Sequence, residues 1–194
     1  ALELLGIIKT VPGGGNYIAD DLDSWLIGPL SILFKLNNGY IRQTQQLRAA
    51  LEREMAILAA RKCTPLDAAE LWRILSNIDK AEDEKIRGEL DKELHTQIAK
   101  IANNPMIYSV LAAADQLTEN IIAGTRDYIM KKNRPEFKVD EQHRLLVEAI
   151  INNDEKGAEQ YMSEHMEIIE KCLDEMQKNS NNKRPANGIV IGGE

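Results

Sequence analysis

The sequence predicts an all-α protein, an antiparallel bundle of six to seven helices with a short β-hairpin at the N-terminus. Hydrophobic residues make up 43% of the 194 residues and aromatic residues only 5%. Leucine, isoleucine and alanine therefore supply most of the apolar content, which favours helices over sheets. Apolar residues recur at helical spacing over most of the chain. The signals for strands are confined to residues 1–22.

The N-terminal segment, residues 1–22, begins with "ALELL", which is typical of the end of a helix. The runs "GIIKTV" and "NYIA" then flank a turn rich in proline and glycine, so we expect two strands joined as a hairpin. The last residues, 179–194, are largely polar and are expected to form a disordered tail. The expected organisation is therefore the N-terminal segment, a helical domain at residues 23–178 and the tail.

The helical domain is predicted to be divided by proline, glycine and asparagine breaks. Residues 64–78 carry the clearest start signal. There, Thr64 fits the N-cap, Pro65 the first helical position and Asp67 the third. The expected helices are residues 23–36, 38–62, 64–78, 83–101, 105–132, 140–152 and 154–178.

Two of these helices carry apolar stripes that should face the core. The stripe on residues 83–101 is bordered by Asp91 and His95. These two residues are four apart, so they project from one face of the helix, one turn from each other. The stripes consist of Leu47, Leu51, Met55 and Leu58 on the earlier helix and of Ile86, Leu90, Leu94 and Ile98 on the later one.

The other two histidines, His143 and His165, lie on the apolar faces of the last two helices. A short turn near position 154 joins these helices, so they should be antiparallel neighbours. Position 154 is midway between the two histidines. We therefore expect the two imidazoles to sit at the same height and to face each other.

All three histidines of the chain, together with Asp91, are thus candidates for the inside of the bundle. Three imidazoles and one carboxylate suit a divalent transition metal such as zinc, nickel or manganese. The alternative is structural, because core-facing histidines often serve as hydrogen-bonded packing residues and an Asp/His pair at this spacing is common on helix surfaces. Spacing and periodicity alone leave both interpretations open.

The charge and the cysteines narrow the function classes. The formal net charge is −7 and the pI is about 5.1, so the chain as given has no general electrostatic attraction to DNA or to an anionic membrane. Cys63 and Cys172 form no CxxC pattern, which favours buried thiols in a reducing, cytoplasmic location. No apolar run approaches the roughly 20 residues that span a bilayer, so no membrane partner is expected. The absence of an initiator Met suggests that the chain begins inside a longer protein.

Three stretches carry a family resemblance: "LRAALEREMAILAARKCTPLDAAEL", "DKELHTQIAKIANNPMI" and "QHRLLVEAIINNDEKGAEQYMSEH". Together they resemble the effector-binding domain, called FCD, of GntR-family transcription regulators of the FadR-like branch, over roughly residues 38–176. The resemblance implies an all-α antiparallel bundle. In many members one Asp and three His hold a metal that a small carboxylate effector reaches. Carried over by motif, the metal ligands are Asp91, His95, His143 and His165, with zinc preferred and nickel or manganese as alternatives.

Two further residues match family positions: Arg48 one that often faces the effector pocket, and Asn104 the asparagine after the Asp/His helix. Arg48 could pair with an effector carboxylate, for which a guanidinium is well shaped. The alternative for Arg48 is an intrahelical pair with Glu52 at i+4. Asn104 is first interpreted as a helix N-cap before Pro105, and only then as pocket lining.

The N-terminal segment is similar to the end of the recognition helix and the β-hairpin wing of the family's winged helix-turn-helix domain. The helices that precede this wing in the family are absent from the chain. Lys9 and the backbone amides of "KTVPGGG" would face phosphates in the full-length protein, so a DNA operator is expected as a partner only there. A homodimer is expected because operators are usually two-fold symmetric.

The resemblance favours a sensory module in which a metal-bound pocket reads a small organic acid and shifts a dimer between DNA-binding states. One alternative is a metal-dependent enzyme acting on small carboxylates, since an open metal position can activate water. The sequence offers no convergent general base for it, so no enzyme is expected. The other alternative is a helical bundle without a metal, whose histidines are packing residues.

Overall fold

The computed structural model describes residues 3, 8–18, 41–115, 128 and 138–181. The expected helix at residues 23–36, the second half of the one expected at 105–132 and the tail beyond 181 lie outside the described residues. Within the described ranges the chain is helical apart from one small two-stranded sheet. The predicted all-α class with an N-terminal hairpin is therefore confirmed.

The hairpin consists of β1 (Ile8–Val11) and β2 (Gly15–Ile18), paired antiparallel so that Val11 lies opposite Gly15. Its turn depends on glycine, because Gly13 and Gly15 have φ values of 77° and 98°, which side chains with a Cβ rarely adopt. The Gly14 amide donates to the Val11 carbonyl at 2.9 Å and closes the turn. The hairpin predicted from two β-prone runs around a Pro-Gly turn is therefore present.

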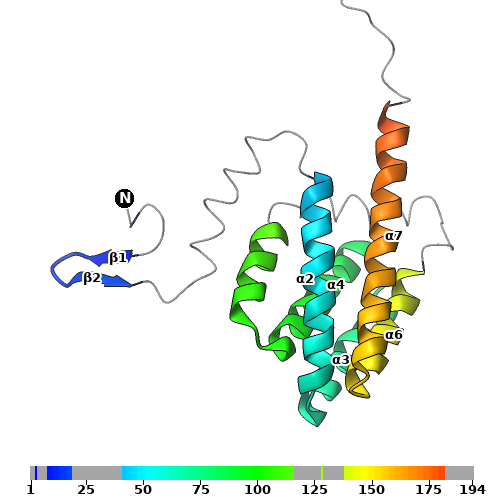
Figure 1. The fold of residues 1–194 in the computed structure, drawn as a ribbon, viewed down its shortest axis with the longest axis horizontal. Coiled ribbons are helices and arrows are strands. Elements are labelled where there is room, and N and C mark those ends of the chain that lie inside the picture. The colour runs from blue at the N-terminus through cyan, green and yellow to red at the C-terminus, as the bar shows by residue number, and fades with distance from the viewer. Residues whose placement is uncertain (1–2, 4–7, 19–40, 116–127, 129–137, 182–194) are drawn as a thin grey trace, which may run out of the picture.

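The bundle is organised around α2 (Ile41–Lys62), which packs against α4 (Glu84–Ala102), α6 (Val139–Ile151) and α7 (Glu155–Asn181). Figure 1 shows α2 and α7 side by side and running in opposite directions. The fifth labelled helix, α3 (Pro65–Lys80), packs against α4 and α6. Residues 105–115 are also helical.

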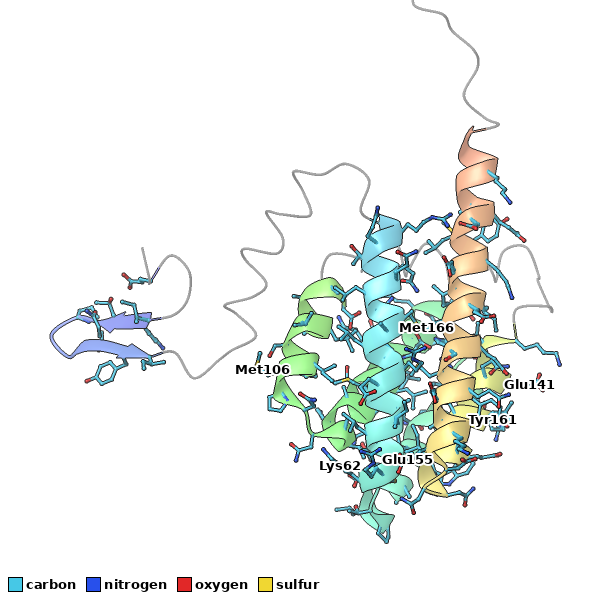
Figure 2. The ribbon with its side chains drawn as sticks, viewed as in Figure 1. Lys62, Met106, Glu141, Glu155, Tyr161 and Met166 are labelled. Atoms are coloured by element: carbon cyan, nitrogen blue, oxygen red, sulfur yellow. The ribbon has the colours of Figure 1, made fainter. Side chains whose placement is uncertain are left out.

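Ion pairs join α2 and α7 near both ends of their antiparallel contact. Arg42, in the first turn of α2, pairs with Asp174 late in α7. Arg61, in the last turn of α2, pairs with Glu155 at the start of α7, with 2.6 Å between Nη2 and Oε2. In the same end of the bundle the Lys62 ammonium donates to the Ala102 carbonyl at 2.6 Å, which ties the end of α4 to α2 (Figure 2).

The core is built from aliphatic and methionine side chains of α2, α3, α4, α6 and α7. A fully buried Leu, Ile or Met contributes about 1.5–3 kcal/mol through burial. The largest fully buried apolar side chains are Met55, Leu71, Ile74, Leu75, Ile78, Leu94, Ile98, Leu146, Val147, Ile150 and Met162.

One apolar stripe begins a turn later than predicted. Ile86, expected in the core, is 51% exposed because the first turn of α4 presents a neighbouring residue to the bundle instead. There, Arg87 donates from Nε to the Ile78 carbonyl at 3.3 Å and pairs with Asp140 of α6 at 3.2 Å. The buried part of the stripe therefore begins after Leu90, which is itself only partly buried.

Helix starts and turns follow the sequence signals closely. Thr64 caps α3 in a capping box with Asp67, with Pro65 as the first helical residue, as predicted. The turn between α6 and α7 uses Asn153 at a φ of 55°, and the side-chain Nδ2 of Asn153 donates to the Ala60 carbonyl of α2 at 2.7 Å. This short anchored turn makes α6 and α7 antiparallel neighbours. The helix α7 ends at Asn181, three residues into the segment predicted as tail.

None of the helices in the described ranges is long and apolar enough to cross a membrane.

Candidate metal and effector site

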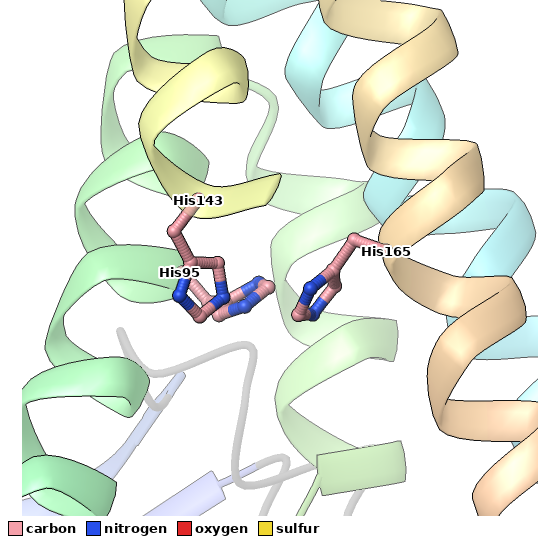
Figure 3. Close-up of side chains that lie close together, drawn as sticks. All are labelled: His95, His143 and His165. Carbon is pink, nitrogen blue, oxygen red and sulfur yellow. The ribbon is translucent and has the colours of Figure 1, made fainter. Parts of the chain in front are cut away.

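Three imidazoles meet inside the bundle, one from each of three helices. His95 comes from α4, His143 from α6 and His165 from α7 (Figure 3). The ring centroids of His143 and His165 are 4.6 Å apart, and His95 lies 5.1 Å from His165 and 5.6 Å from His143. One potential ligand atom from each ring lies within 4.8 Å of the others. The expectation that His143 and His165 face each other across the α6–α7 turn is confirmed.

Asp91 completes this group. It lies one turn before His95 on α4, and its Oδ1 is 3.2 Å from Nε2 of His143. The four residues predicted as metal ligands are therefore gathered in one place, and we call them the histidine cluster. Their role as ligands stays a prediction.

The chemistry of the histidine cluster fits a divalent transition metal. Three imidazole nitrogens and a carboxylate oxygen are a donor set typical of zinc and of neighbouring first-row metals. His143 is fully buried and His165 is 4% exposed. Nδ1 of His165 is buried and has no hydrogen-bond partner in the described part of the chain. A buried nitrogen without a partner is costly, and a bound ion would give this atom a partner.

A second set of polar side chains lies beside the histidine cluster, mainly on α2. Gln45, Arg48 and Glu52 are 5%, 7% and 2% exposed, although they are polar or charged. Asp115, at the end of the described helical residues 105–115, joins them through Arg48. We call these four residues the α2 charged row.

Arg48 is the centre of the α2 charged row. Its Nη2 donates to Oε1 of Glu52 at 3.0 Å, and its Nε donates to Oδ1 of Asp115 at 2.5 Å. Its Nη1 donates to Oε1 of Gln45 at 3.2 Å. The predicted i,i+4 pair with Glu52 is therefore present, but it is buried rather than on the surface. The effector-binding role of Arg48 stays a prediction.

Glu52 links the two sets of residues. Its Oε2 is 2.7 Å from Nδ1 of His95. Burial raises the pKa of the Glu52 carboxyl, but the His95 charge and hydrogen bond, with Arg48, outweigh it and lower this pKa to about 2. Burial likewise lowers the pKa of His95, but Glu52 and then Asp91 raise it to about 9. Glu52 is therefore a carboxylate at neutral pH, despite its burial.

His165 differs from His95 in its electrostatics. Burial, together with the nearby His143 and His95, holds the pKa of His165 well below its ordinary value. His165 is therefore neutral at physiological pH, which is the form that binds a metal. No carboxylate stands within ion-pair distance of His165 in the described part of the chain.

The other two predicted site residues lie elsewhere in the structure. Asn104 accepts a hydrogen bond from the Ile107 amide at 3.2 Å, at the start of helical residues 105–115, so its side chain serves as the expected N-cap. Lys9 lies on β1 opposite Tyr17 and is exposed. The pocket role of Asn104 and the DNA-binding role of Lys9 stay predictions.

Sequence reasoning missed that Glu52 belongs to the interior and that Asp115, whose side chain is 33% exposed, contacts Arg48. Glu52 was considered only as an intrahelical partner of Arg48, and Asp115 was not considered. A signal for Glu52 was present, because it lies between Leu51 and Met55 of the predicted α2 stripe and so borders the core face. Asp115 offered no such signal, since its position depends on how residues 105–115 pack.

The fold defines the class of protein first: an antiparallel helical bundle with a polar interior, in a chain that also carries a small β-hairpin. The sequence profile of the FCD domain matches residues 43–168. The chain therefore belongs to the FCD-domain family of GntR-type transcription regulators.

Curated relatives agree with this family. The HTH-type transcriptional regulator YcbG of Bacillus subtilis is 28% identical over 87% of this chain and 68% of its own length. The putative L-lactate dehydrogenase operon regulatory protein of Escherichia coli is 23% identical over 84% of this chain and 65% of its own length. The chain thus spans about two thirds of the length of these relatives. They are regulators, which confirms the prediction that the chain is not an enzyme.

Solved structures share the fold. The Streptococcus agalactiae GntR structure has a TM-score of 0.60 at 23% identity, and the match covers 88% of this chain and 77% of that one. The E. coli McbR/YncC structure has a TM-score of 0.60 at 18% identity, covering 90% of this chain and 80% of that one. At these identities the likeness supports the helical architecture.

Proposed function

We propose that this chain is the effector-sensing part of a transcription regulator of the FadR-like branch, and that it binds a small organic acid at a protein-held divalent metal. The observation that carries the proposal is the convergence of His95, His143 and His165 on one buried point, with Asp91 beside them. These four residues would hold the ion, zinc first and nickel or manganese as alternatives. When bound, the ion supplies a Lewis-acidic anchor for carboxylate or hydroxyl oxygens of the effector.

The charge balance of the interior supports a divalent cation. Three carboxylates, those of Asp91, Glu52 and Asp115, lie in or next to the site, and Arg48 is the guanidinium that contacts two of them. In the metal-binding state, in which the imidazoles are neutral and the carboxylates ionised, these groups leave two negative charges for the ion to balance. Buried charge is costly without a counter-charge, so a divalent cation at the histidine cluster would relieve this imbalance.

Arg48 gives the effector a second point of contact. Its guanidinium is held in place by Glu52, Gln45 and Asp115, so it is pre-organised for a carboxylate. The E. coli relative is named for an L-lactate dehydrogenase operon, which agrees with a small organic acid as effector. A long acyl chain would fit poorly against the polar groups of this interior.

Regulation would follow from the origin of the ligands on three helices. An acid bound at the histidine cluster contacts α4, α6 and α7 together, so it stabilises one packing of these helices over another. In a homodimer of the full-length protein, such repacking would change the spacing of two winged-helix domains on a two-fold operator. The hairpin at β1 and β2, with Lys9, would then belong to the wing that contacts phosphates.

The test begins with metal analysis of protein purified without a histidine tag, which should contain about one transition-metal ion per chain. Replacing both His143 and His165 with Ala should abolish metal retention. Lys92→Ala is the matched control, because Lys92 is exposed on α4 between Asp91 and His95. Metal-free protein that also shows no affinity for zinc or nickel on titration would refute the metal site.

The effector is tested with a thermal-shift panel of small carboxylates, run with and without added zinc. At least one acid should raise the melting temperature only when zinc is present. If the same acid raises the melting temperature of the variant with both His143→Ala and His165→Ala by as much as that of wild type, binding occurs away from the histidine cluster.

A further inference from the structure

The residue on α2 that contacts the histidine cluster is Glu52. The four proposed ligands lie on α4, α6 and α7, yet α2 directs a carboxylate with 2% exposure at one of them. Oε2 of Glu52 is 2.7 Å from Nδ1 of His95, across 43 residues of sequence. Sequence spacing does not account for this contact, because it depends on the packing of α2 against α4.

We infer that Glu52 is a positioning residue for the metal site: it accepts the Nδ1–H of His95 and so leaves Nε2 of His95 as the nitrogen that binds the ion. This inference rests on the proposed function, since it concerns the same site. A neutral histidine carries one N–H, and the hydrogen bond of one nitrogen decides which nitrogen remains to bind a metal. A carboxylate on the far nitrogen also fixes the plane of the ring.

Both oxygens of Glu52 are already engaged, which separates a positioning role from a ligand role. Oε2 contacts His95, and Oε1 accepts from Nη2 of Arg48 at 3.0 Å. Arg48 is held in turn by Asp115 at 2.5 Å and by Gln45 at 3.2 Å. The orientation of His95 is therefore supported by a chain of buried and partly buried contacts that crosses from α4 to α2 and on to residues 105–115.

His95 is the histidine that most needs such support. It is 13% exposed at its side chain, whereas the side chain of His143 is 1% exposed. A less enclosed ring is less restricted by packing, so a strong hydrogen bond contributes more to its orientation. Removing a carboxylate behind a metal-binding histidine typically lowers metal affinity about 10–100-fold.

The experiment compares the zinc affinity of wild type, Glu52→Gln and Glu54→Gln by competition with a chromogenic chelator. Glu54 is the matched control, because it is exposed on the same helix two residues away. Glu52→Gln should weaken zinc binding about 10–100-fold, and Glu54→Gln should leave it unchanged. Equal zinc affinity of Glu52→Gln and wild type would overturn the positioning role while leaving the proposed function intact. If wild type itself binds no zinc, the proposed function fails and the inference fails with it.

NMR of the zinc-loaded protein gives a second, independent test, and its main comparison needs only wild type. In the zinc-loaded protein, ¹⁵N-labelled histidine NMR should show a slowly exchanging Nδ1–H on His95 and zinc at its Nε2. The Nδ1–H signal should shift strongly in Glu52→Gln, which a purely structural role of Glu52 would not cause. A proton on Nε2 of zinc-loaded His95, with zinc on Nδ1, would overturn the inference without any variant.

Discussion

Two polar groups share the interior of this bundle, and they are satisfied to very different degrees. In the α2 charged row, every nitrogen of the Arg48 guanidinium and both oxygens of Glu52 have a partner within 3.2 Å, and among the described residues of the row the exception is Nε2 of Gln45. In the histidine cluster, Nδ1 of His165 is buried without a hydrogen-bond partner in the described part of the chain. A satisfied network stabilises the protein in its own right, whereas an unsatisfied one is stabilised by what it binds.

This difference gives the two groups different expected roles: structural support for the α2 charged row and ligand binding for the histidine cluster. The α2 charged row resembles a scaffold that holds one side of the site in a fixed geometry. We expect the histidine cluster to be the part whose free energy changes when a metal ion binds. Substitutions in the row should therefore change the stability of the metal-free protein, and substitution of Glu52 should also weaken metal binding. Substitutions in the cluster should change mainly the response to metal.

The largest expected effect is that of Arg48→Met. This change keeps the apolar stem but leaves Glu52 and Asp115 without their shared counter-charge in the interior. Breaking a buried ion pair in this way costs about 3–5 kcal/mol of unfolding free energy. Urea denaturation of the metal-free protein should show this loss as a lower midpoint.

Arg53→Met is the matched control for Arg48→Met on the same helix. The Arg53 side chain is 51% exposed, and it pairs with Glu159 at 4.0 Å. An exposed pair of this kind is worth at most about 1 kcal/mol. Similar losses for the two variants would mean that burial does not distinguish the α2 charged row from the surface.

The second prediction concerns metal removal. Zinc at 100 times its dissociation constant should stabilise wild type by about 2.7 kcal/mol, because it binds the folded chain. His143→Ala should lose this gain, since it removes a proposed ligand with a fully buried ring. Thermal unfolding with excess zinc and with a chelator measures the zinc-dependent gain in wild type and its loss in His143→Ala. A zinc-dependent gain that persists in His143→Ala would place the binding elsewhere.

The fold and the histidine cluster were accessible from sequence because each depends on local pattern. The start of α3 follows from Thr64, Pro65 and Asp67, which interact within one turn. His143 and His165 meet because a short turn joins two amphipathic helices. The period of these helices and the length of the turn can be read from the sequence. The predicted bundle and this contact are accordingly confirmed.

The α2 charged row was not accessible in the same way. A charged residue on a helix is usually solvated, so the position of Glu52 beside the apolar stripe was a weak reason to expect burial. Its burial results from long-range packing of α2 against α4, and the contact with His95 spans 43 residues. The opposite error occurred at Ile86, where an apolar residue at the right period lies beyond the packed part of α4.

The third prediction tests the one unsatisfied atom of the α2 charged row. Nε2 of Gln45 is buried and lacks a partner in the described ranges, while its Oε1 accepts from Arg48. Gln45→Met removes both atoms in a side chain of similar shape. The loss of a hydrogen bond to a charged group, about 1.5–3 kcal/mol, is offset by removal of an orphaned donor that costs about 1–3 kcal/mol. Urea denaturation should therefore find a change within about 1 kcal/mol. A much larger loss would mean that Nε2 of Gln45 has a partner that stabilises the fold.

The smallest expected effect is that of Asp115→Asn, which keeps an oxygen to accept from Arg48 and removes the charge. Burial raises the pKa of Asp115 above its ordinary value, although Arg48 opposes this. The folded protein thus takes up a proton on Asp115 at a higher pH than the unfolded chain does. The stability due to Asp115 is greatest at low pH and is lost as the pH rises through the folded-state pKa.

Wild type should therefore become more stable relative to Asp115→Asn as the pH falls from 7. This change should continue down to the ordinary pKa of an aspartate, about 3.9. The slope cannot exceed about 1.4 kcal/mol per pH unit, the limit for one proton. Urea denaturation of both variants over this range gives the slope directly, because other titrating groups cancel in the difference. A shift of the opposite sign would mean that Arg48 stabilises the Asp115 carboxylate by more than burial destabilises it. Asp115 would then belong to the satisfied network as fully as Glu52 does, and the contrast with the histidine cluster would be sharper.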